Sequence, residues 1–260
     1  MVKALTIAGS DSSGGAGIQA DLKTFCAHNV YGMSVICALT AQNTCGVFDV
    51  FNASASSVAK QLDAVFTDIF PDAVKIGMVS SAQIIEIIAD KLRQYQAKNI
   101  VLDPVMISTS GHRLIEDEAE GALVKRLFPL ADIITPNISE AEHLSGVSIQ
   151  NREDMAAAAE KLGKYVHGAV LVKGGHLDNC ADDLLWQEGK AVWFPGKRID
   201  TKNTHGTGCT LSSAIASNLA GGQSMEEAVR NAKEYVAGAL ETGFHLGNGN
   251  GPLNHLYNMR

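Results

Sequence analysis

The sequence predicts an α/β protein built on a mostly parallel sheet with helices on both faces. Short apolar runs alternate with longer amphipathic segments along the 260 residues, the order expected of repeated strand–helix units. The short runs are continuously apolar, as in strands that are buried on both faces. Hydrophobic residues make up 46% of the chain, enough for the core of one domain spanning residues 1–260.

Six apolar runs give the expected strands, and the segments between them give the expected helices. Strands are expected at residues 4–8, 34–39, 73–76, 100–102, 132–134 and 169–172. Helices are expected at residues 16–28, 56–69, 82–96, 116–128, 152–166, 211–219 and 225–242. Asn151 precedes the fifth of these helices, where an asparagine can act as the cap.

Two segments depart from this alternation. Residues 183–186 and 191–194 flank the turn 187–190, a pattern typical of a small antiparallel hairpin, which belongs at the edge of the sheet. Residues 247–251 are rich in glycine and asparagine, which predicts a mobile segment.

Charge and cysteine usage exclude several classes of protein. The net charge is −7 and no basic run occurs, which argues against nucleic acid or an anionic membrane as a partner. The five cysteines are scattered and form no Cys-x-x-Cys pair, which indicates reduced thiols in the cytoplasm and neither a disulfide framework nor a zinc site. No apolar run could span a membrane, and residues 1–9 are too short for a signal peptide.

The most informative motif is a glycine-rich loop that leads directly into the helix expected at residues 211–219. It reads Thr204-His205-Gly206-Thr207-Gly208-Cys209-Thr210. The two glycines let backbone N–H groups converge, and the helix dipole adds positive charge, so the motif predicts an anion hole for phosphate. Cys209 at its mouth is expected to have a lowered thiol pKa. The alternative is a helix cap without a ligand, and the Walker pattern Gly-x-x-x-x-Gly-Lys-Ser/Thr is absent.

A second glycine-rich loop follows the first expected strand and runs from Gly9 to Asp21. Ligands of open α/β sheets bind at the carboxyl ends of the strands, so this loop is well placed to admit a small ligand. Its glycines lack the Gly-x-Gly-x-x-Gly spacing of a dinucleotide site. Asp21 either accepts hydrogen bonds from a substrate or only complements the helix dipole.

Three later strand ends carry polar side chains. Asp103 ends one buried strand and can hold a metal or orient a ligand. Asn137 and Glu140 follow the next strand, where they either face a magnesium-bound phosphate or cap a short helix. Lys173 lies just past another strand, where it either neutralises phosphate or is simply solvated.

The order of these motifs resembles the ribokinase-like family of small-molecule kinases over residues 4–246. Within it, the opening Gly-Ser-Asp-Ser-x-Gly-Gly-Ala-Gly-Ile-Gln-Ala-Asp resembles the hydroxymethylpyrimidine and phosphomethylpyrimidine kinases of thiamine biosynthesis. The resemblance implies a three-layer α/β/α sandwich and a phosphotransferase that uses ATP with Mg²⁺. It implies two successive phosphorylations of 4-amino-5-hydroxymethyl-2-methylpyrimidine, first of the alcohol and then of the monophosphate. The expected partners are this aminopyrimidine and ATP, and a homodimer is allowed.

The resemblance also implies roles for individual residues. Around the pyrimidine it places Gly9, Asp21, Gln42, Met78, Val105 and Cys209. Near the nucleotide it places Asn137, Thr207 and Lys173, with Glu140 and Asp103 at the metal. The catalytic group is then Gly206, Gly208, Cys209 and Lys173. An Asp commonly stands at the position of Cys209 in the wider family and acts as the base, so the base is left open here, with His205 near enough in sequence to assist.

Gln42 also has a physical interpretation of its own. An aminopyrimidine edge pairs a ring-nitrogen acceptor with an amine donor, and a carboxamide matches that edge with two hydrogen bonds. Met78 and Val105 supply apolar faces for the ring or are ordinary core residues. Three rival functions stay open: a pyridoxal or pyridoxine kinase, a hydrolase built on Cys209 and His205, and a non-catalytic sensor of vitamin precursors. Gln42 favours the pyrimidine over pyridoxal, which has no amine beside a ring nitrogen.

Overall fold

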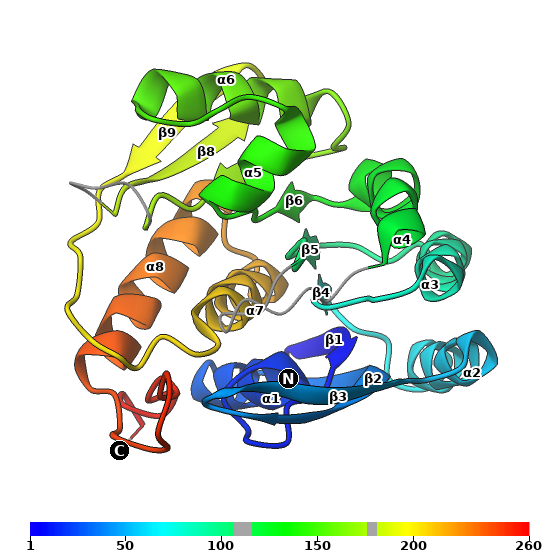
Figure 1. Ribbon diagram of the computed structural model, residues 1–260. Helices are drawn as coiled ribbons and strands as arrows, with labels where there is room; N and C mark the ends of the chain where they lie inside the picture. Colours follow the sequence, from blue (N-terminus) through cyan, green and yellow to red (C-terminus); the bar gives the residue numbers. More distant parts are fainter. Residues whose placement is uncertain (107–115, 176–180, 260) are drawn as a thin grey trace.

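The computed structural model describes residues 1–106, 116–175 and 181–259, and a central sheet runs through the whole of this part (Figure 1). Its strands are β1 (Lys3–Gly9), β2 (Tyr31–Asn43), β3 (Gly46–Asn52), β4 (Ala73–Ile76), β5 (Ile100–Leu102), β6 (Ile133–Ile134), β7 (Ala169–Val172), β8 (Asp183–Gln187) and β9 (Lys190–Phe194). They lie in the order β3-β2-β1-β4-β5-β6-β7-β8-β9. The neighbouring strands β2, β1, β4, β5, β6 and β7 are all parallel. β3 at one edge of the sheet, and β8 and β9 at the other, pair in the antiparallel sense.

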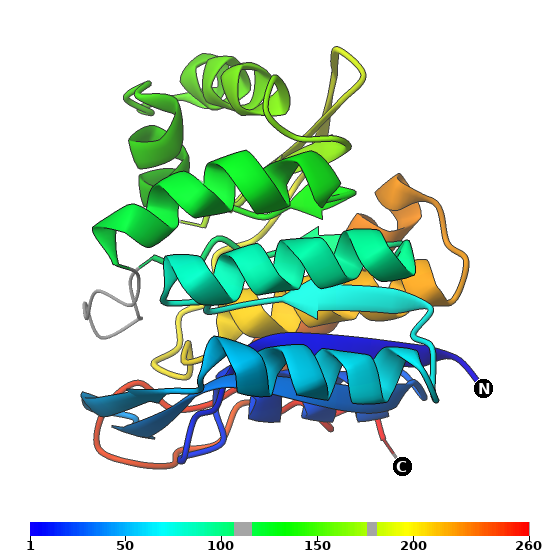
Figure 2. The same cartoon turned by 90° about the vertical axis from the view of Figure 1, so that its right-hand side faces the viewer.

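Helices cover both faces of this sheet. They are α1 (Gly17–Ala27), α2 (Ala55–Phe66), α3 (Ala82–Tyr95), α4 (Asp117–Ala122), α5 (Ile138–Ser145), α6 (Arg152–Gly163), α7 (Thr207–Ala220) and α8 (Met225–Glu241). One apolar core lies beneath α2 to α6, and a second lies beneath α1, α7 and α8. Figure 2 shows α2, α3 and the helices that follow side by side over one face. The layers therefore form the α/β/α sandwich that the sequence predicts.

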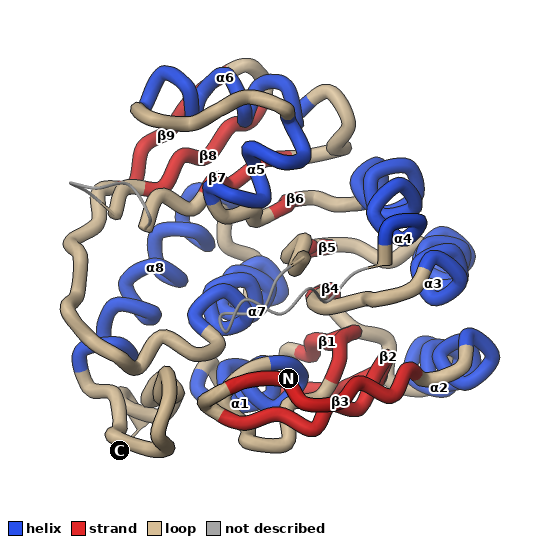
Figure 3. The backbone as a smooth tube through the Cα atoms, in the orientation of Figure 1, coloured by secondary structure: helices blue, strands red, loops and turns tan. Residues whose placement is uncertain are grey.

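Five of the expected strands, at residues 4–8, 73–76, 100–102, 132–134 and 169–172, are confirmed, and so is the edge hairpin. The tube in Figure 3 shows where the prediction falls short: β2 is much longer than residues 34–39, and it turns back into β3. β3 was not predicted because most of its side chains are exposed, so it lacks the continuous apolar pattern. The helix expected at 116–128 ends as a π turn, η1 (Leu123–Leu127), and a 3₁₀ turn, η2 (Phe128–Leu130), which contains Pro129.

Two corrections concern the segments around the anion-hole motif. The helix expected at 211–219 begins earlier, at Thr207, so the glycine motif is itself the first turn of α7. The segment 247–251, expected to be mobile, is held by hydrogen bonds. Asn250 donates its backbone N–H to Thr44, and Gly251 donates to Lys202 and accepts from His205. None of the helices described here is long and apolar enough to cross a membrane.

Candidate active site

The first turn of α7 faces the carboxyl ends of the parallel strands. Gly206 caps the helix with φ of 87°, and any Cβ there would overlap the backbone oxygen of Gly15. Only glycine fits this position, since it requires both a left-handed conformation and a close approach of two backbones. At Gly208 an ideal Cβ would lie 3.3 Å from Asp103 Oδ2 and 3.4 Å from Lys173 Nζ. The second glycine therefore leaves room for the charged pair in front of the helix.

Asp103 and Lys173 form that pair although they are 70 residues apart. Lys173 Nζ donates to Asp103 Oδ1 over 3.0 Å, and Thr135 Oγ1 donates to the same oxygen over 3.2 Å. Each of the three follows a strand by one residue, and the parallel sheet brings their strand ends to one edge. The Asp103 side chain is 2% exposed and that of Lys173 is 16% exposed. Asp103 and Lys173 thus lie beside the glycine motif, and their roles at the metal and the nucleotide stay predictions.

Asn137 and Glu140 adopt the helix-capping arrangement that the sequence analysis left as an alternative. The Asn137 side chain accepts from the Glu140 N–H at 2.9 Å, and Glu140 Oε2 accepts from the Asn137 N–H at 2.8 Å. This capping box starts α5. Burial raises the pKa of Glu140 to about 6, Lys173 opposes this, and the Asp103 carboxylate adds to it. A buried carboxylate beside another carboxylate is a group that a cation would stabilise.

The donor set fits Mg²⁺ held jointly with phosphate oxygens. The described residues contain no cluster of three or more His, Cys, Asp or Glu side chains placed to hold a metal. Mg²⁺, however, is usually bound through one or two carboxylates together with substrate phosphates and water. Glu140 and Asp103 supply two carboxylates whose charges both interact with Lys173.

Asp21 lies in a buried ion pair and does not face the space where a substrate was expected. Its side chain is completely buried, and both carboxylate oxygens lie 2.9 Å from Lys75 Nζ. Thr6 Oγ1 donates to it at 2.6 Å and Ser213 Oγ at 2.7 Å. The protein already supplies four hydrogen bonds to this carboxylate, so the expectation that it accepts bonds directly from a substrate is corrected. Lys75 was missed because it is a single lysine inside an otherwise apolar strand.

The expectation for Cys209 also needs correction. The side chain is half-buried, and burial raises the pKa of its thiol to about 11. Lys75 and the N–H of Gly17, which bonds the sulfur, lower the pKa, but they do not offset the loss of hydration. Cys209 is therefore a protonated thiol at neutral pH and not the thiolate that its place on a helix N-terminus predicts.

His205 is neither solvated nor bonded to Cys209. It is 6% exposed, and its Nε2 lies 2.8 Å from Oδ2 of the buried Asp11. Asp11 also accepts from the N–H groups of Ser13, Gly15 and Ala16, and these bonds hold the pKa of its carboxyl at about 2 despite burial. The pair thus joins the two glycine-rich loops and does not form a hydrolase dyad. The sequence analysis missed Asp11, whose only signal is its place between a strand and a glycine cluster.

Gly9, Met78, Val105 and Gln42 lie around the ends of β1, β2, β4 and β5. A Cβ on Gly9 would lie 3.1 Å from Met78 Sδ, so this glycine lets the thioether approach the backbone. The backbone N–H of Gln42 donates to Ser12 Oγ and its carbonyl accepts from the same hydroxyl, at 2.9 and 2.7 Å. Met78, Val105 and Gln42 are half-buried. Contact of these residues with a pyrimidine stays a prediction.

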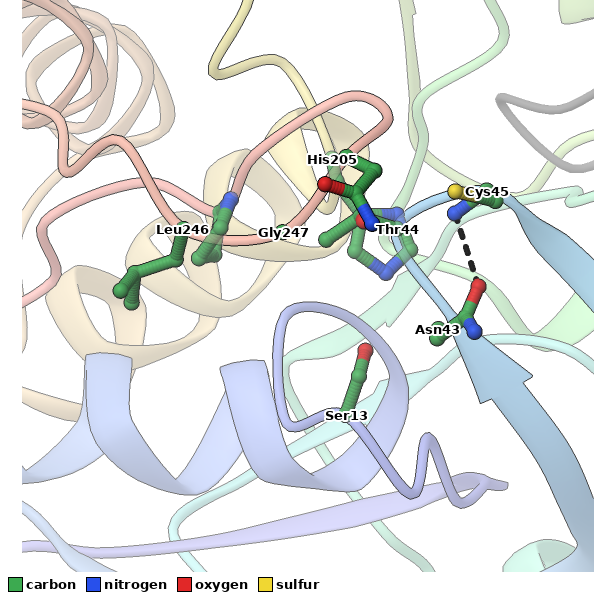
Figure 4. A pocket seen from close by; sticks show the side chains of 9 residues that line it. Ser13, Asn43, Thr44, Cys45, His205, Leu246 and Gly247 are labelled. Carbon is green, nitrogen blue, oxygen red and sulfur yellow. Dashed lines mark hydrogen bonds between the residues drawn. The ribbon is translucent and has the colours of Figure 1, made fainter.

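A cavity of about 290 Å³ lies next to His205 and the turn between β2 and β3 (Figure 4). It is lined by Ser13, Asn43, Thr44, Cys45, His205, Leu246, Gly247, Asn248 and Pro252. None of the residues predicted to bind the pyrimidine lines it. Thr207, which the resemblance places near the nucleotide, donates its hydroxyl to the backbone carbonyl of Thr204 at 2.7 Å.

Comparison with known proteins gives a consistent result. The family model described as phosphomethylpyrimidine kinase matches residues 11–254. The hydroxymethylpyrimidine/phosphomethylpyrimidine kinase of Rhizobium meliloti is 51% identical over 98% of this chain and 97% of its own length. A thiamine biosynthesis bifunctional protein of Geobacter sulfurreducens is 50% identical over 97% of this chain, which spans 52% of that longer protein.

Two solved structures are similar over almost the whole chain. Phosphomethylpyrimidine kinase from Clostridium difficile is 51% identical with a TM-score of 0.83, covering 91% of this chain and 98% of that one. Pyridoxal kinase from Staphylococcus aureus, in complex with AMP-PCP and pyridoxal, is 34% identical with a TM-score of 0.91. That match covers 100% of this chain and 95% of the pyridoxal kinase.

Proposed function

This chain belongs to the phosphomethylpyrimidine kinase family, and we propose that it phosphorylates 4-amino-5-hydroxymethyl-2-methylpyrimidine and then its monophosphate, with ATP as donor, for thiamine biosynthesis. The observation that carries the proposal is the approach of Gly208 to both Asp103 and Lys173. Helix N–H groups, a lysine and a carboxylate then surround one point at the carboxyl edge of a parallel sheet. That combination suits a phosphoryl group in transfer.

The residues of this chain act mainly through charge and position. The N-terminal N–H groups of α7 and the Lys173 ammonium stabilise the negative charge that spreads over the phosphoryl oxygens. Glu140 and Asp103 would hold Mg²⁺, which supplies charge neutralisation between the nucleotide phosphates. The solved pyridoxal kinase with AMP-PCP supports ATP as the donor.

The two phosphorylations differ in their need for a base. The alcohol must lose a proton during the first transfer, whereas a phosphate monoester is already ionised near neutral pH because its second pKa is about 6. With a thiol pKa of about 11, Cys209 holds its proton at neutral pH and is a poor base for the first step. A loose, metaphosphate-like transition state requires little proton removal before transfer, which is compatible with a thiol there.

Pyridoxal phosphorylation is the second candidate, because the pyridoxal kinase of Staphylococcus aureus has the same fold over almost its whole length. The test is a coupled ATP-consumption assay with the hydroxymethylpyrimidine, its monophosphate, pyridoxal and buffer alone, each with and without Mg²⁺. The proposal expects turnover with both pyrimidines and a much lower kcat/KM with pyridoxal. Turnover with pyridoxal alone would replace the pyrimidine assignment.

We further propose a cytoplasmic homodimer that pairs through the β2–β3 hairpin. Leu39 and Phe51 lie opposite each other on one face of the hairpin, and Val50 lies on the other face. These side chains and that of Phe48 are exposed, with both phenylalanines 69% exposed. Exposed apolar side chains gathered on one hairpin are typical of an interface. Sedimentation of the protein should give a dimer, and Phe48→Ser with Phe51→Ser should give a monomer of unchanged melting temperature. A monomeric wild type would reject this surface. Reduced cysteines support the cytoplasmic location.

A further inference from the structure

The hydroxyl of Thr40 is a polar group beside the proposed substrate residues that the mechanism above does not use. Thr40 lies in β2, two residues before Gln42, and alternate residues of a strand share a face. Thr40 is 8% exposed. Its Oγ1 lies 2.8 Å from the backbone carbonyl oxygen of Ser10 and 3.1 Å from Oε1 of Gln42. The hydroxyl therefore connects the end of β1 with the side chain that we expect to bind the pyrimidine edge.

The Thr40 hydroxyl has one proton for two acceptor oxygens. Both oxygens lie within hydrogen-bond distance, so the proton is shared between them in a three-centre bond. Within the described part of the chain, no other hydrogen bond involves the side-chain carboxamide of Gln42. Its oxygen therefore keeps one lone pair, and its nitrogen keeps both protons, for a ligand.

The orientation of a carboxamide decides which ligand edge it matches. Turning the group by half a circle about its last bond exchanges the oxygen and the nitrogen, and this torsion has no strong preference of its own. An aminopyrimidine requires the oxygen opposite its amine and the nitrogen opposite its ring nitrogen. In the reversed orientation donor faces donor and acceptor faces acceptor, so both bonds are lost. A group that holds one orientation therefore removes an ordering cost from binding.

Thr40 is itself held firmly enough to orient its neighbour. The backbone N–H of Ser10 donates to the carbonyl of Ala38 on β2 at 2.8 Å, and the Thr40 hydroxyl donates back to the Ser10 carbonyl. The loop after β1 is thus bonded to β2 on both sides of Ser10. A β-branched side chain also has few rotamers. The hydroxyl oxygen of Thr40 consequently has a fixed place beside the Gln42 oxygen.

We propose that Thr40 is a positioning residue for substrate choice: its hydroxyl holds the Gln42 oxygen, so that the carboxamide presents oxygen and nitrogen in the order that the aminopyrimidine edge requires. The effect on binding rests on the proposed function, since it assumes that the pyrimidine pairs with Gln42. The orientation of Gln42 itself is tested without any substrate.

The first test is calorimetry without ATP, with the hydroxymethylpyrimidine and pyridoxal as probes. Thr40→Val keeps the shape of the side chain and removes only the hydroxyl, so it should weaken pyrimidine binding about fivefold, the value of one ordinary hydrogen bond. Thr40→Ser keeps the hydroxyl and should bind the pyrimidine like wild type. Pyridoxal lacks the aminopyrimidine edge, so its affinity should be the same in all three proteins. Unchanged pyrimidine binding in Thr40→Val, or an equal loss with pyridoxal, would overturn the proposal.

A double-mutant cycle separates an effect through Gln42 from an effect through Ser10. Thr40→Val also removes the bond to the Ser10 carbonyl, and that loss persists whatever residue stands at position 42. In a Gln42→Met background, Thr40→Val should therefore leave kcat/KM for the pyrimidine unchanged, because there is no carboxamide left to orient. A further fivefold loss in this background would show that Thr40 acts by holding the loop, and the proposal would fail.

A measurement on the wild type keeps the test decisive if Thr40→Val does not fold. The side-chain amide signals of Gln42 are identified in ¹H–¹⁵N NMR spectra by their absence from Gln42→Met. Both amide protons should exchange freely with water in the ligand-free protein, because Thr40 bonds the oxygen. One protected proton would place the nitrogen against Thr40 and overturn the proposal. If the protons exchange as expected but the wild type neither binds nor phosphorylates the pyrimidine, the proposed function fails while the orientation of Gln42 stands.

Discussion

Gly206 and Gly208 lie two residues apart at the start of α7, yet a methyl group meets different neighbours at the two positions. At Gly206 it meets backbone, and φ is 87°. At Gly208 it meets only the ends of two side chains, 3.3 and 3.4 Å away. We therefore expect Gly206→Ala to lower the melting temperature strongly, because both strain and overlap destabilise the loop.

Gly208→Ala should instead keep a melting temperature close to that of wild type and lose turnover. The methyl group pushes Asp103 and Lys173 away from the anion hole, and a small displacement of a charged group costs on the order of 100-fold in rate. Thermal unfolding and single-turnover rates on both variants test this difference. Equal losses of stability in the two variants would show that the second glycine, like the first, serves the fold.

At the residue scale, we expect Gln42 to determine the choice between pyrimidine and pyridoxal. Gln42→Met should remove two hydrogen bonds to the aminopyrimidine edge and cost about 1–3 kcal/mol in kcat/KM for the pyrimidine. Use of pyridoxal should fall much less, because it lacks that edge. The substitution also removes the bond that Gln42 Oε1 accepts from Thr40 Oγ1 at 3.1 Å, but the backbone bonds of Gln42 to Ser12 remain and should hold the loop. A parallel decline with both substrates would assign Gln42 to support of the fold.

At the scale of an element, we expect Glu140 of α5 to combine a structural role, as part of the capping box, with a chemical role at the metal. Glu140→Gln keeps an acceptor for the Asn137 N–H, so the capping box survives, but it removes a buried charge. Because the folded pKa, about 6, lies above the ordinary 4.5, ionisation of Glu140 costs stability. That cost is absent below pH 4.5 and complete once the pH has risen through 6.

Glu140→Gln should accordingly be more stable than wild type at pH 8, by about 2 kcal/mol at most, and no more stable at pH 4.5. Its Mg²⁺-dependent turnover should fall, while pyrimidine binding measured by calorimetry without ATP stays intact. Lys173→Ala is the companion variant, with lower turnover for lack of positive charge. Weaker pyrimidine binding together with a lower melting temperature would make both residues structural.

The elements also show which parts of the chain its sequence specifies locally. The strands at 73–76 and 100–102 were predicted to the residue because burial on both faces leaves a run that is apolar except for Lys75. β3 carries no such run, and its partner β2 sets it by pairing. The ion pair of Lys75 was not predicted either. The apolar strand around Lys75 predicts that it is buried, but its partner Asp21 is 54 residues away in the sequence.

At the scale of the whole molecule, the sequence predicts that the site lies at the carboxyl ends of the strands. It does not predict how the charged groups there interact with one another. The order of the parallel strands brings Asp103 and Lys173 together, and the family resemblance had implied places for both near the nucleotide and its metal. The thiol pKa of Cys209 was predicted with the wrong sign. A helix N-terminus lowers the thiol pKa, but burial raises it by a larger amount, and the sequence does not reveal how deeply the side chain is buried.

Acid stability should depend on Asp11, which joins parts of the chain that are far apart. Its carboxyl pKa is about 2 in the folded protein and 3.8 ordinarily. Its contribution is therefore complete above pH 3.8 and is lost as the pH falls through 2. Asp11→Asn should lose about 2 kcal/mol at pH 7 in urea unfolding, and the difference from wild type should vanish near pH 2. Asp68→Asn, at an exposed position, should match wild type throughout.

The bond between Asp11 and His205 spans 194 residues, and His205 is held in turn by the carbonyl of Gly251. During synthesis the amino-terminal loop leaves the ribosome first and has no partner for most of translation. The bond between the two loops can form only after His205 has emerged, and the contact of His205 with Gly251 forms later still. A growing chain can thus fold much of its sheet early, but the proposed phosphate site is completed only late in synthesis, so a chain stopped short of His205 should be folded in part and inactive.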